Sequence, residues 1–328
     1  MKLYSKFPAL ALILLALLFT FTACEKDDAT NPDPTINEAE VLVKYLEASG
    51  DYINTTTTSI VPATTVYTNL TSGTQYIIDI RDTTAFKNGH IHGAVRVDLA
   101  NLLTHVKTVP ANFTSIVVVC YSGQSAAYGV SLLRLLGYNK VSSMKFGMAS
   151  WDSVFARTTW IPQLSNQYWS QFVTTATPKG PKGNLPTINT GKTTGAEILD
   201  ARANELFAQG FSAASVTKGT VFGNLSGYYI VNYWPVEQYN AGHIPGAIQY
   251  IKPDFKDTVN LRTLPIDKPI AIYCYTGQTS AFLAAYFKLL GYDAKSLSFG
   301  GNGMMYDNMP ANKFIASEIK GYPYVTGN

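Results

Sequence analysis

The sequence predicts an α/β protein that contains two copies of one domain. The main observation is a set of segments that occur twice. CYSGQS at 120–125 matches CYTGQT at 274–279, GHIHGA at 89–94 matches GHIPGA at 242–247, and LLGY occurs at 135–138 and 289–292. The offset is nearly constant, since 243 − 90 is 153 for the histidines and 274 − 120 is 154 for the cysteines. A constant offset over this length indicates a duplicated domain.

Length and composition agree with this organisation. The 328 residues give room for two domains of ordinary size, and a hydrophobic content of 46% allows substantial cores. Only 14% of the residues are charged, and the formal net charge is +3. Since no basic stripe with interleaved aromatic residues is present, the composition argues against a nucleic-acid partner.

The N-terminus is typical of an exported bacterial lipoprotein. Lys2 and Lys6 precede an apolar run at 7–21, which is too short to span a bilayer stably. Ala23 followed by Cys24 resembles a lipobox, in which the cysteine becomes the lipidated N-terminus. We expect a signal peptide at 1–23 and a polar tether at 24–37. The lipid would anchor the protein in the cell envelope at the outer membrane, on its periplasmic or surface face. An ordinary cleaved signal and an uncleaved anchor helix are the alternatives.

The first copy is predicted over residues 38–162. AEVL at 39–42 opens an amphipathic helix and matches AEIL at 196–199. Short apolar strands are expected at 76–80, 115–119 and 140–144, and helical stretches separate them. Strands that are apolar on both faces and alternate with helices argue for a parallel sheet covered on both sides.

A linker is predicted between the copies, at residues 163–190. TATPKGPKG at 175–183 combines Pro, Gly and Lys without apolar periodicity, which is typical of a connecting segment. The second copy then extends over residues 191–328.

Cys120 and Cys274 are the candidate nucleophiles. Each ends an apolar strand and opens a glycine-containing turn before a helix, at the sheet edge where α/β proteins bind ligands. The N-terminus of a helix attracts anions and stabilises a thiolate, so sulfur chemistry is the leading hypothesis. If Cys24 carries the lipid, these two thiols remain. A disulfide between them would require the two loops to face each other closely.

These motifs resemble the rhodanese family of sulfurtransferases. IIDIR at 77–81, GHIHGA at 89–94 and Cys120 at the head of a six-residue loop follow the order of that family's motifs. The resemblance covers residues 38–160 and 190–325. It implies two tandem rhodanese-like domains, each a five-stranded parallel sheet with helices on both faces.

The resemblance also implies a mechanism. The cysteine thiolate takes a sulfane sulfur from a donor as a persulfide and passes it to a thiol or another thiophilic acceptor. No metal and no organic cofactor is implied. The persulfide would be cradled by backbone N–H groups of two loops, which comprise Tyr121, Ser122, Gly123, Gln124 and Ser125 in the first copy and Tyr275, Thr276, Gly277, Gln278 and Thr279 in the second.

Structural support for the loops is expected from Asp79, Arg81, His90 and His243. In this family the turn histidine is structural, and an Asp–Arg pair would tie the sheet edge to the neighbouring loop. Alignment of the Gly-His pairs, however, puts an asparagine at 232 and a tryptophan at 234 where the first copy has the pair. The resemblance therefore leaves open how the Cys274 loop is supported and which copy is active.

The loops also depart from the family pattern in charge. Their side chains are all neutral, whereas many rhodaneses that use thiosulfate carry Arg or Lys in this loop. Because a charge-assisted hydrogen bond contributes about 1.5–3 kcal/mol, we expect poor thiosulfate affinity and a persulfide or polysulfide as the donor.

Two alternatives to an envelope-anchored sulfurtransferase follow from the same residues. The first is a non-catalytic rhodanese-like module that binds a sulfur species or a protein partner, which the neutral loops favour. The second is a relative of phosphatases or arsenate reductases, which use Cys-x5-Arg. The sequence disfavours this second class, because Ala126 and Ser280 occupy the arginine position.

Overall fold

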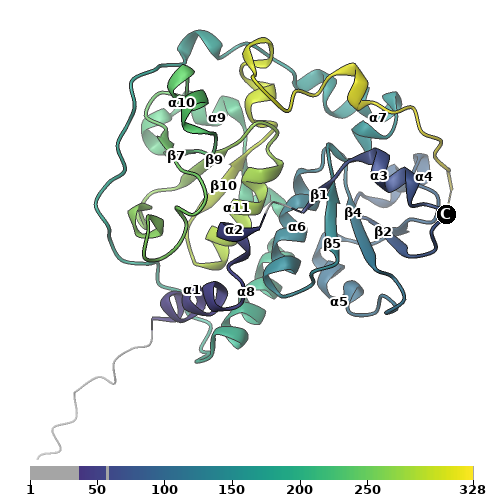
Figure 1. Cartoon of the computed structure of the whole chain (residues 1–328), viewed down its shortest axis with the longest axis horizontal. Coiled ribbons are helices and arrows are strands. Elements are labelled where there is room, and N and C mark those ends of the chain that lie inside the picture. Colours follow the sequence, from purple (N-terminus) through teal and green to yellow (C-terminus); the bar gives the residue numbers. More distant parts are fainter. Residues whose placement is uncertain (1–36, 57–58, 328) are drawn as a thin grey trace, which may run out of the picture. The chain divides into compact units, whose positions relative to one another are not determined.

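Two parallel five-stranded sheets, one in each repeat, form the framework of the protein (Figure 1). The computed structural model describes residues 37–56 and 59–327. The first sheet has the order β1-β5-β4-β2-β3 and the second the order β6-β10-β9-β7-β8, with every pairing parallel. The predicted fold class is confirmed. The strands are β1 (Ile60–Val61), β2 (Gln75–Asp79), β3 (Val95–Arg96), β4 (Ser115–Val119), β5 (Val141–Met144), β6 (Ser215–Val216), β7 (Tyr229–Asn232), β8 (Ile248–Gln249), β9 (Ile270–Tyr273) and β10 (Ala294–Leu297).

Helices flank both sheets (Figure 1). They are α1 (Glu38–Ala48), α2 (Tyr52–Thr55), α3 (Ala63–Thr68), α4 (Thr83–Asn88), α5 (Leu102–Val106), α6 (Gln124–Leu135) and α7 (Ser153–Thr159) in the first half, and α8 (Gly195–Gln209), α9 (Lys218–Gly223), α10 (Val236–Ala241) and α11 (Gln278–Leu289) in the second. Within residues 37–56 and 59–327, none of the helices has the length and apolar character needed to cross a membrane. The expected signal peptide, the lipidation site at Cys24 and residues 24–36 of the expected tether lie outside the described residues, while Asn37, the last residue of that tether, caps α1.

The central strands place the two cysteines at equivalent edges. Four of the five residues of β4 and all four of β9 are buried, as expected for strands covered on both faces. The cysteine follows directly after each strand, so both thiols lie at the carboxyl edge of a parallel sheet. This edge is where open α/β sheets bind their ligands.

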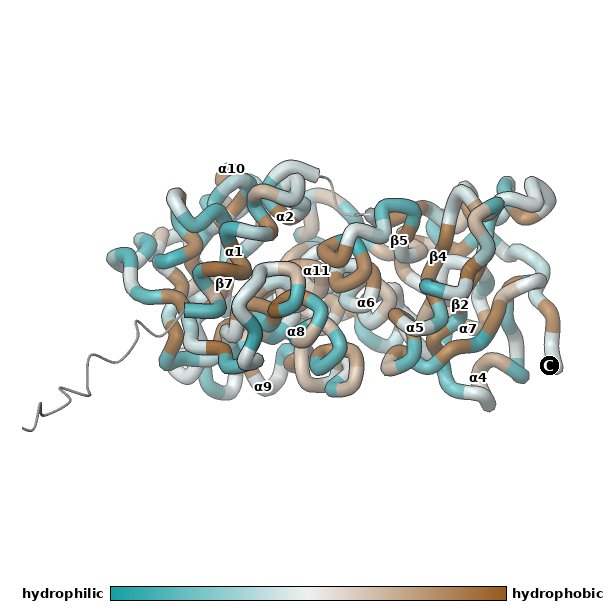
Figure 2. The backbone as a smooth tube through the Cα atoms, turned by 90° about the horizontal axis from the view of Figure 1, so that it is seen from below, coloured by the Kyte–Doolittle hydropathy of each residue, from teal (hydrophilic) through white to brown (hydrophobic). Residues whose placement is uncertain are grey.

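Helices α6 and α11, which follow the cysteine loops, pack against each other where the two repeats meet (Figure 1). Both helices are buried on nearly every side, and Figure 2 shows hydrophobic residues along the tube around α11. The Ser131 hydroxyl of α6 donates to the backbone oxygen of Phe282 in α11 at 2.9 Å. A helix that is apolar all round is stable only when it is buried, so each repeat needs the other to cover this helix.

The repeated LLGY segment ends both of these helices. Gly137 and Gly291 have φ values of +91° and +95°, a left-handed conformation that favours glycine. The tyrosine N–H that follows donates back to a helix carbonyl at 3.0 Å in both repeats. This geometry is a Schellman-type helix stop, which explains why the motif occurs twice.

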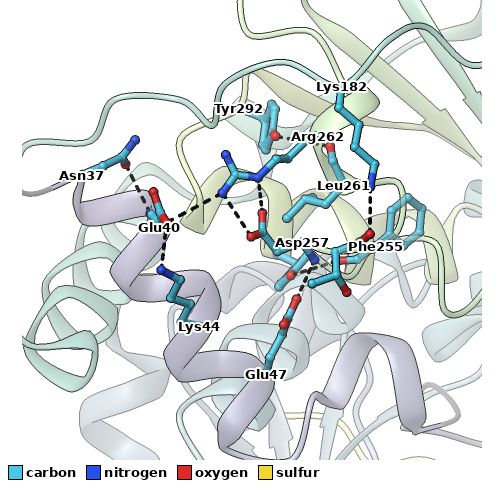
Figure 3. A network of polar contacts seen from close by, with 12 residues as sticks. Asn37, Glu40, Lys44, Glu47, Lys182, Phe255, Asp257, Leu261, Arg262 and Tyr292 are labelled. Atoms are coloured by element: carbon cyan, nitrogen blue, oxygen red, sulfur yellow. Dashed lines mark hydrogen bonds and ion pairs between the residues drawn. The ribbon is translucent and has the colours of Figure 1, made fainter.

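The first helix of each repeat packs on the other repeat. Helix α1 lies along α8 and reaches the segment after β8, where Glu47 accepts the backbone N–H of Asp257 at 2.6 Å (Figure 3). Helix α8 in turn packs against residues 99–101 of the first repeat, and Tyr128 of α6 donates to the backbone oxygen of Leu206 at 3.5 Å. Residues 37–328 accordingly form one compact unit.

The segment that connects the two repeats packs against the rest of the protein. Residues 174–194, which include part of the linker predicted at 163–190, contain no helix or strand. The side chains of Leu185 and Ile188 are nevertheless buried, and the Gly183 N–H donates to the backbone oxygen of Arg262 at 2.7 Å. The segment therefore follows a defined path over the second repeat and reaches the start of α1.

Glu38 joins the end of this connection to α1. Its carboxylate accepts the Thr190 N–H at 2.7 Å, the Thr190 hydroxyl at 2.6 Å and the Gly191 N–H at 2.9 Å. Burial acts to raise the pKa of Glu38, but the hydrogen bonds from Thr190 and Gly191 together hold it below the ordinary value of 4.5. A carboxylate with a lowered pKa stabilises the fold at neutral pH, and this contribution is lost as the pH falls through that pKa.

We expect Glu38→Gln to lower the free energy of unfolding by about 1–3 kcal/mol near neutral pH, because the three charge-assisted hydrogen bonds to the carboxylate are weakened or lost. The deficit should shrink as the pH falls below about 4, where the wild-type carboxylate also becomes neutral. Urea unfolding at a series of pH values measures it. Glu237→Gln, an exposed first-turn glutamate of α10, is the control and should change little. A deficit that is constant at all pH values would contradict the assignment.

Candidate active site at the two cysteine loops

Both cysteines lie at the base of a loop with backbone N–H groups directed at the sulfur. Cys120 is 2% exposed, and its Sγ accepts N–H groups from Gly123 at 3.1 Å and Ala126 at 3.4 Å. Cys274 is 3% exposed; its Sγ accepts the Ser280 N–H at 3.3 Å, and its thiol donates to the Ser280 hydroxyl at 3.6 Å. Both are free thiols, so the alternative of a disulfide between them is wrong. Donors at the start of a helix favour a negatively charged sulfur.

A glycine turn after the neighbouring strand supports each loop. A Cβ added to Gly147 would lie 2.4 Å from the Cys120 carbonyl oxygen, and one added to Gly300 would lie 2.2 Å from that of Cys274. Both glycines also have positive φ, +60° and +50°. The N–H of the following residue donates to the cysteine carbonyl, at 2.8 Å and 3.0 Å. Only glycine allows so close an approach, which fixes the backbone of each cysteine.

Gln124 and Gln278 connect each loop to the opposite repeat. Gln278 accepts the Phe146 N–H at 2.8 Å and donates to the backbone oxygens of Gly123 and Met144, both at 3.3 Å. Gln124 accepts the Phe299 N–H at 2.9 Å in the reciprocal contact. Both glutamines are almost fully buried.

These contacts change the interpretation of the two glutamines. The sequence placed them only in the persulfide-binding loops, whereas the structure directs their side-chain amides at the other repeat. A signal was present in the sequence, since the same long polar residue opens a predicted apolar helix in both copies. A buried amide at such a position requires hydrogen-bond partners, and here the partners come from across the interface.

Asp79 and Arg81 form a buried ion pair behind the first loop. Arg81 Nη2 lies 2.6 Å from Asp79 Oδ2, and both side chains are 1% exposed. The same nitrogen donates to the backbone oxygen of Gly89 at 2.7 Å. The pair therefore ties the end of β2 to the Gly-His turn.

The second repeat makes the same connection without charges. The Asn232 side chain donates to the Tyr273 hydroxyl at 2.7 Å, and this hydroxyl also accepts the Ile244 N–H of the turn at 3.2 Å. Asn232 accepts the Trp234 N–H at 3.0 Å, as Asp79 does from the corresponding N–H in the first repeat. A neutral network thus replaces the ion pair, and the Cys274 loop keeps its support.

His90 and His243 have structural positions. Their Nδ1 atoms lie 2.8 Å and 2.7 Å from a backbone oxygen of the preceding helix, and both side chains are buried. The backbone of His90 pairs with Val325, from the end of the chain, and that of His243 pairs with Val173, from the connection between the repeats. The segment after each sheet thus packs on the other repeat.

The tyrosines next to the two cysteines have different surroundings. The Tyr121 hydroxyl donates to Asp82, and burial followed by this hydrogen bond raises the pKa of Tyr121 to about 12. Tyr275 stacks on Trp234 with ring centroids 5.3 Å apart. Burial, followed by the nearby charge of Cys274, raises the pKa of Tyr275 to about 12. Its hydroxyl is buried, stays protonated at neutral pH and has no hydrogen-bond partner among residues 37–56 and 59–327.

A cavity of about 380 Å³ opens at the Cys274 loop. Its walls contain loop residues of the second repeat together with Lys145 of the first. The loop residues are Tyr275, Thr276, Gln278 and Thr279. In the part of the chain that the structure describes, no group of three or more His, Cys, Asp or Glu side chains is arranged to hold a metal ion.

The remaining loop residues of the first repeat lie beside Cys120. Ser122 is half-buried, and its hydroxyl accepts the side-chain amide of Gln124 at 3.0 Å. The buried Trp160 donates its indole N–H to the Ser122 carbonyl at 3.1 Å. Ser125 is half-buried in the first turn of α6. These contacts position the loop backbone, whose N–H groups are the expected cradle.

We expect Arg81→Met to lower the free energy of unfolding by about 3–5 kcal/mol, because it leaves the buried Asp79 carboxylate without its partner. The double variant Asp79→Asn/Arg81→Met should lose less, since no unpaired charge remains, as in the second repeat. Urea unfolding of both variants measures the difference. Equal losses in the single and double variants would show that the charge of Asp79 is not the cause.

Comparison with known proteins relates the chain to a family. The family model of the rhodanese-like domain matches residues 62–153 and 187–303. Thiosulfate sulfurtransferase GlpE of Shewanella oneidensis is 36% identical over 80 residues, which are 24% of this chain and 78% of that protein. GlpE of Pseudomonas fluorescens is 30% identical over 90 residues, which are 27% of this chain and 77% of that protein.

A solved structure is similar over a larger part of the chain. SseA of Escherichia coli, a 3-mercaptopyruvate sulfotransferase, is 21% identical with a TM-score of 0.27, and the match covers 73% of this chain and 99% of that one. The family model matches more than half of the 328 residues. The chain therefore belongs to the rhodanese-like domain family and carries the domain twice in tandem.

Proposed function

We propose that the protein is a sulfurtransferase that carries sulfane sulfur as a cysteine persulfide. The observation that carries this proposal is the environment of the two thiols. Each Sγ is buried at the start of a helix; that of Cys120 accepts two backbone N–H groups, at 3.1 Å and 3.4 Å, and that of Cys274 accepts one, at 3.3 Å. Such donors stabilise a thiolate and equally a persulfide anion, which has the same charge. Membership in the rhodanese-like family supports the same chemistry.

The reaction has two displacement steps. The cysteine thiolate attacks the sulfane sulfur of the donor, so that a new S–S bond forms and the donor leaves with the electron pair of the broken bond. An acceptor thiolate then attacks the outer sulfur of the persulfide, which restores the cysteine thiolate. Each step exchanges one S–S bond for another, so no external oxidant or reductant is needed.

The donor and the location are part of the proposal. The neutral loop side chains favour a persulfide or polysulfide over thiosulfate as the donor, and the acceptor is a thiol or another thiophilic group. The lipobox-like sequence ending at Cys24 supports a lipid anchor in the cell envelope, which would be the only contact with the membrane.

Intact-protein mass spectrometry tests this function. The chain from residue 25 onward is reduced, incubated with polysulfide or thiosulfate, and compared with the variants Cys120→Ser and Cys274→Ser. We expect a gain of one sulfur that a reductant removes and that disappears with one or both variants.

The same experiment separates this function from a binding module. If no donor adds sulfur to the folded protein while both thiols react with an alkylating reagent, the persulfide mechanism is wrong. A non-catalytic module that binds a sulfur species or a protein partner would then be the better account.

A further inference from the structure

We propose that Lys145 of the first repeat is the cation that binds an anionic sulfur donor at the Cys274 loop of the second repeat. The sequence of each loop alone contains no cation, and the structure supplies one from across the interface. This inference rests on the proposed sulfurtransferase function. It adds a specificity-determining residue and assigns anionic donors to one of the two cysteines.

Lys145 lies in the wall of the cavity that opens at the Cys274 loop. The same wall contains Tyr275, Thr276 and Thr279, so a molecule in this space contacts both the lysine and the loop. The volume of about 380 Å³ is ample for a small oxyanion with its first waters. The Lys145 side chain is 26% exposed, which leaves it accessible from the cavity.

The glutamine of the same loop holds the backbone of Lys145 in place. Gln278 accepts the N–H of the residue after Lys145 at 2.8 Å and donates to the carbonyl of the residue before it at 3.3 Å. Gln278 is itself the fourth residue after Cys274, at the start of α11. The position of the lysine is thus fixed by the loop that carries the reactive thiol, which is the kind of support that a binding residue requires.

The repeats differ at this position. Lys145 follows β5, and its N–H donates to the Val61 carbonyl at 2.8 Å; Ser298 follows β10 and makes the same contact with Val216 at 2.9 Å. Ser298 is therefore the equivalent of Lys145 in the second repeat, and it carries no charge.

Two tyrosine environments strengthen the asymmetry. The Tyr121 hydroxyl donates to the carboxylate of Asp82, so it is not free to bind a sulfur donor. The negative charge of this carboxylate near the Cys120 loop also repels an anionic donor. Pro235 occupies the place of Asp82 in the second repeat, since 82 + 153 is 235. The Tyr275 hydroxyl accordingly remains a donor without a partner within residues 37–56 and 59–327.

Glu318 moderates the charge of Lys145. Its carboxylate lies 2.7 Å from Lys145 Nζ, so the pair is nearly neutral when the cavity is empty. An anionic donor has to compete with this carboxylate for the ammonium group. The arrangement agrees with weak thiosulfate binding in the wild type, and it predicts that removing the carboxylate strengthens that binding.

For thiosulfate the step balances without another reactant. The Cys274 thiolate attacks the outer sulfur, the S–S bond of thiosulfate breaks, and sulfite leaves with the electron pair as a dianion. One negative charge stays on the persulfide and two leave with sulfite, which equals the three charges of the reactants. Lys145 stabilises the oxyanion end both as it enters and as it leaves.

Steady-state kinetics with two donors test the proposal. Thiosulfate is a dianion and dimethyl trisulfide is uncharged, and each is used with the same thiol acceptor. With the trisulfide, the cysteine thiolate attacks the central sulfur and methanethiolate leaves with the electron pair. The acceptor thiolate then attacks the methyl-bearing sulfur, which leaves a persulfide on the cysteine and a mixed disulfide. We expect Lys145→Ser to raise the KM for thiosulfate by about 5- to 20-fold and to leave the KM for the trisulfide unchanged. Glu318→Gln should lower the KM for thiosulfate by about 2- to 5-fold. Lys140→Ser, an exposed lysine just before the same strand, is the matched control.

The two variants separate anion binding from structure, because both break the same ion pair. A purely structural role would move the KM for thiosulfate in the same direction in both, whereas anion binding moves it in opposite directions. Shifts in one direction, or no shift in Lys145→Ser, overturn the inference while the sulfurtransferase function stands. If the wild type forms a persulfide from neither donor, the proposed function fails and the inference fails with it.

Discussion

The contact between α6 and α11 is the constraint on which the rest of the structure depends. Each helix directly follows a cysteine loop, and each is buried on nearly every side. A single repeat cannot bury such a helix between its own sheet and water, so the second repeat covers it. Because the loops lie at the starts of these two helices, burying the helices also brings the loops together.

The glutamines follow from this arrangement. Backbone groups of each repeat become buried at the interface and need partners, and Gln124 and Gln278 supply them from the opposite side. The repeats also contact each other away from these helices. Helix α1 of the first repeat packs on α8 of the second, and Val173 and Val325 each pair with the turn histidine of the opposite repeat. The two repeats therefore form one compact unit and share a site region, although each has its own sheet and its own thiol.

The duplicated backbone carries side chains that have diverged. Both repeats connect the central sheet to the Gly-His turn, but one uses the Asp79–Arg81 ion pair and the other a neutral network around Tyr273. The residues that follow the equivalent strands β5 and β10 also differ, with Lys145 in one repeat and Ser298 in the other. The geometry that stabilises a thiolate is thus common to both cysteines, while the charge that a donor meets is specific to each.

Sequence reasoning could predict the sheets and the place of the cysteines, because apolar strands and a constant repeat offset are local or directly countable features. It also identified that Asn232 and Trp234 replace the ion pair, but it missed Tyr273, which does not belong to the Asp-x-Arg motif. The partners of Gln124 and Gln278 and the position of Lys145 depend on packing between residues more than a hundred positions apart. Such contacts leave no periodic pattern in the sequence.

A crystal structure of the protein after exposure to thiosulfate tests the central claim most directly, namely that the Cys274 loop, completed by the first repeat, binds sulfane sulfur. We expect one additional sulfur atom on Cys274 Sγ, within hydrogen-bond distance of backbone N–H groups of the loop, and an oxyanion in the cavity beside Lys145. An unmodified Cys274 with the added sulfur confined to Cys120, or an oxyanion bound away from Lys145, would contradict it.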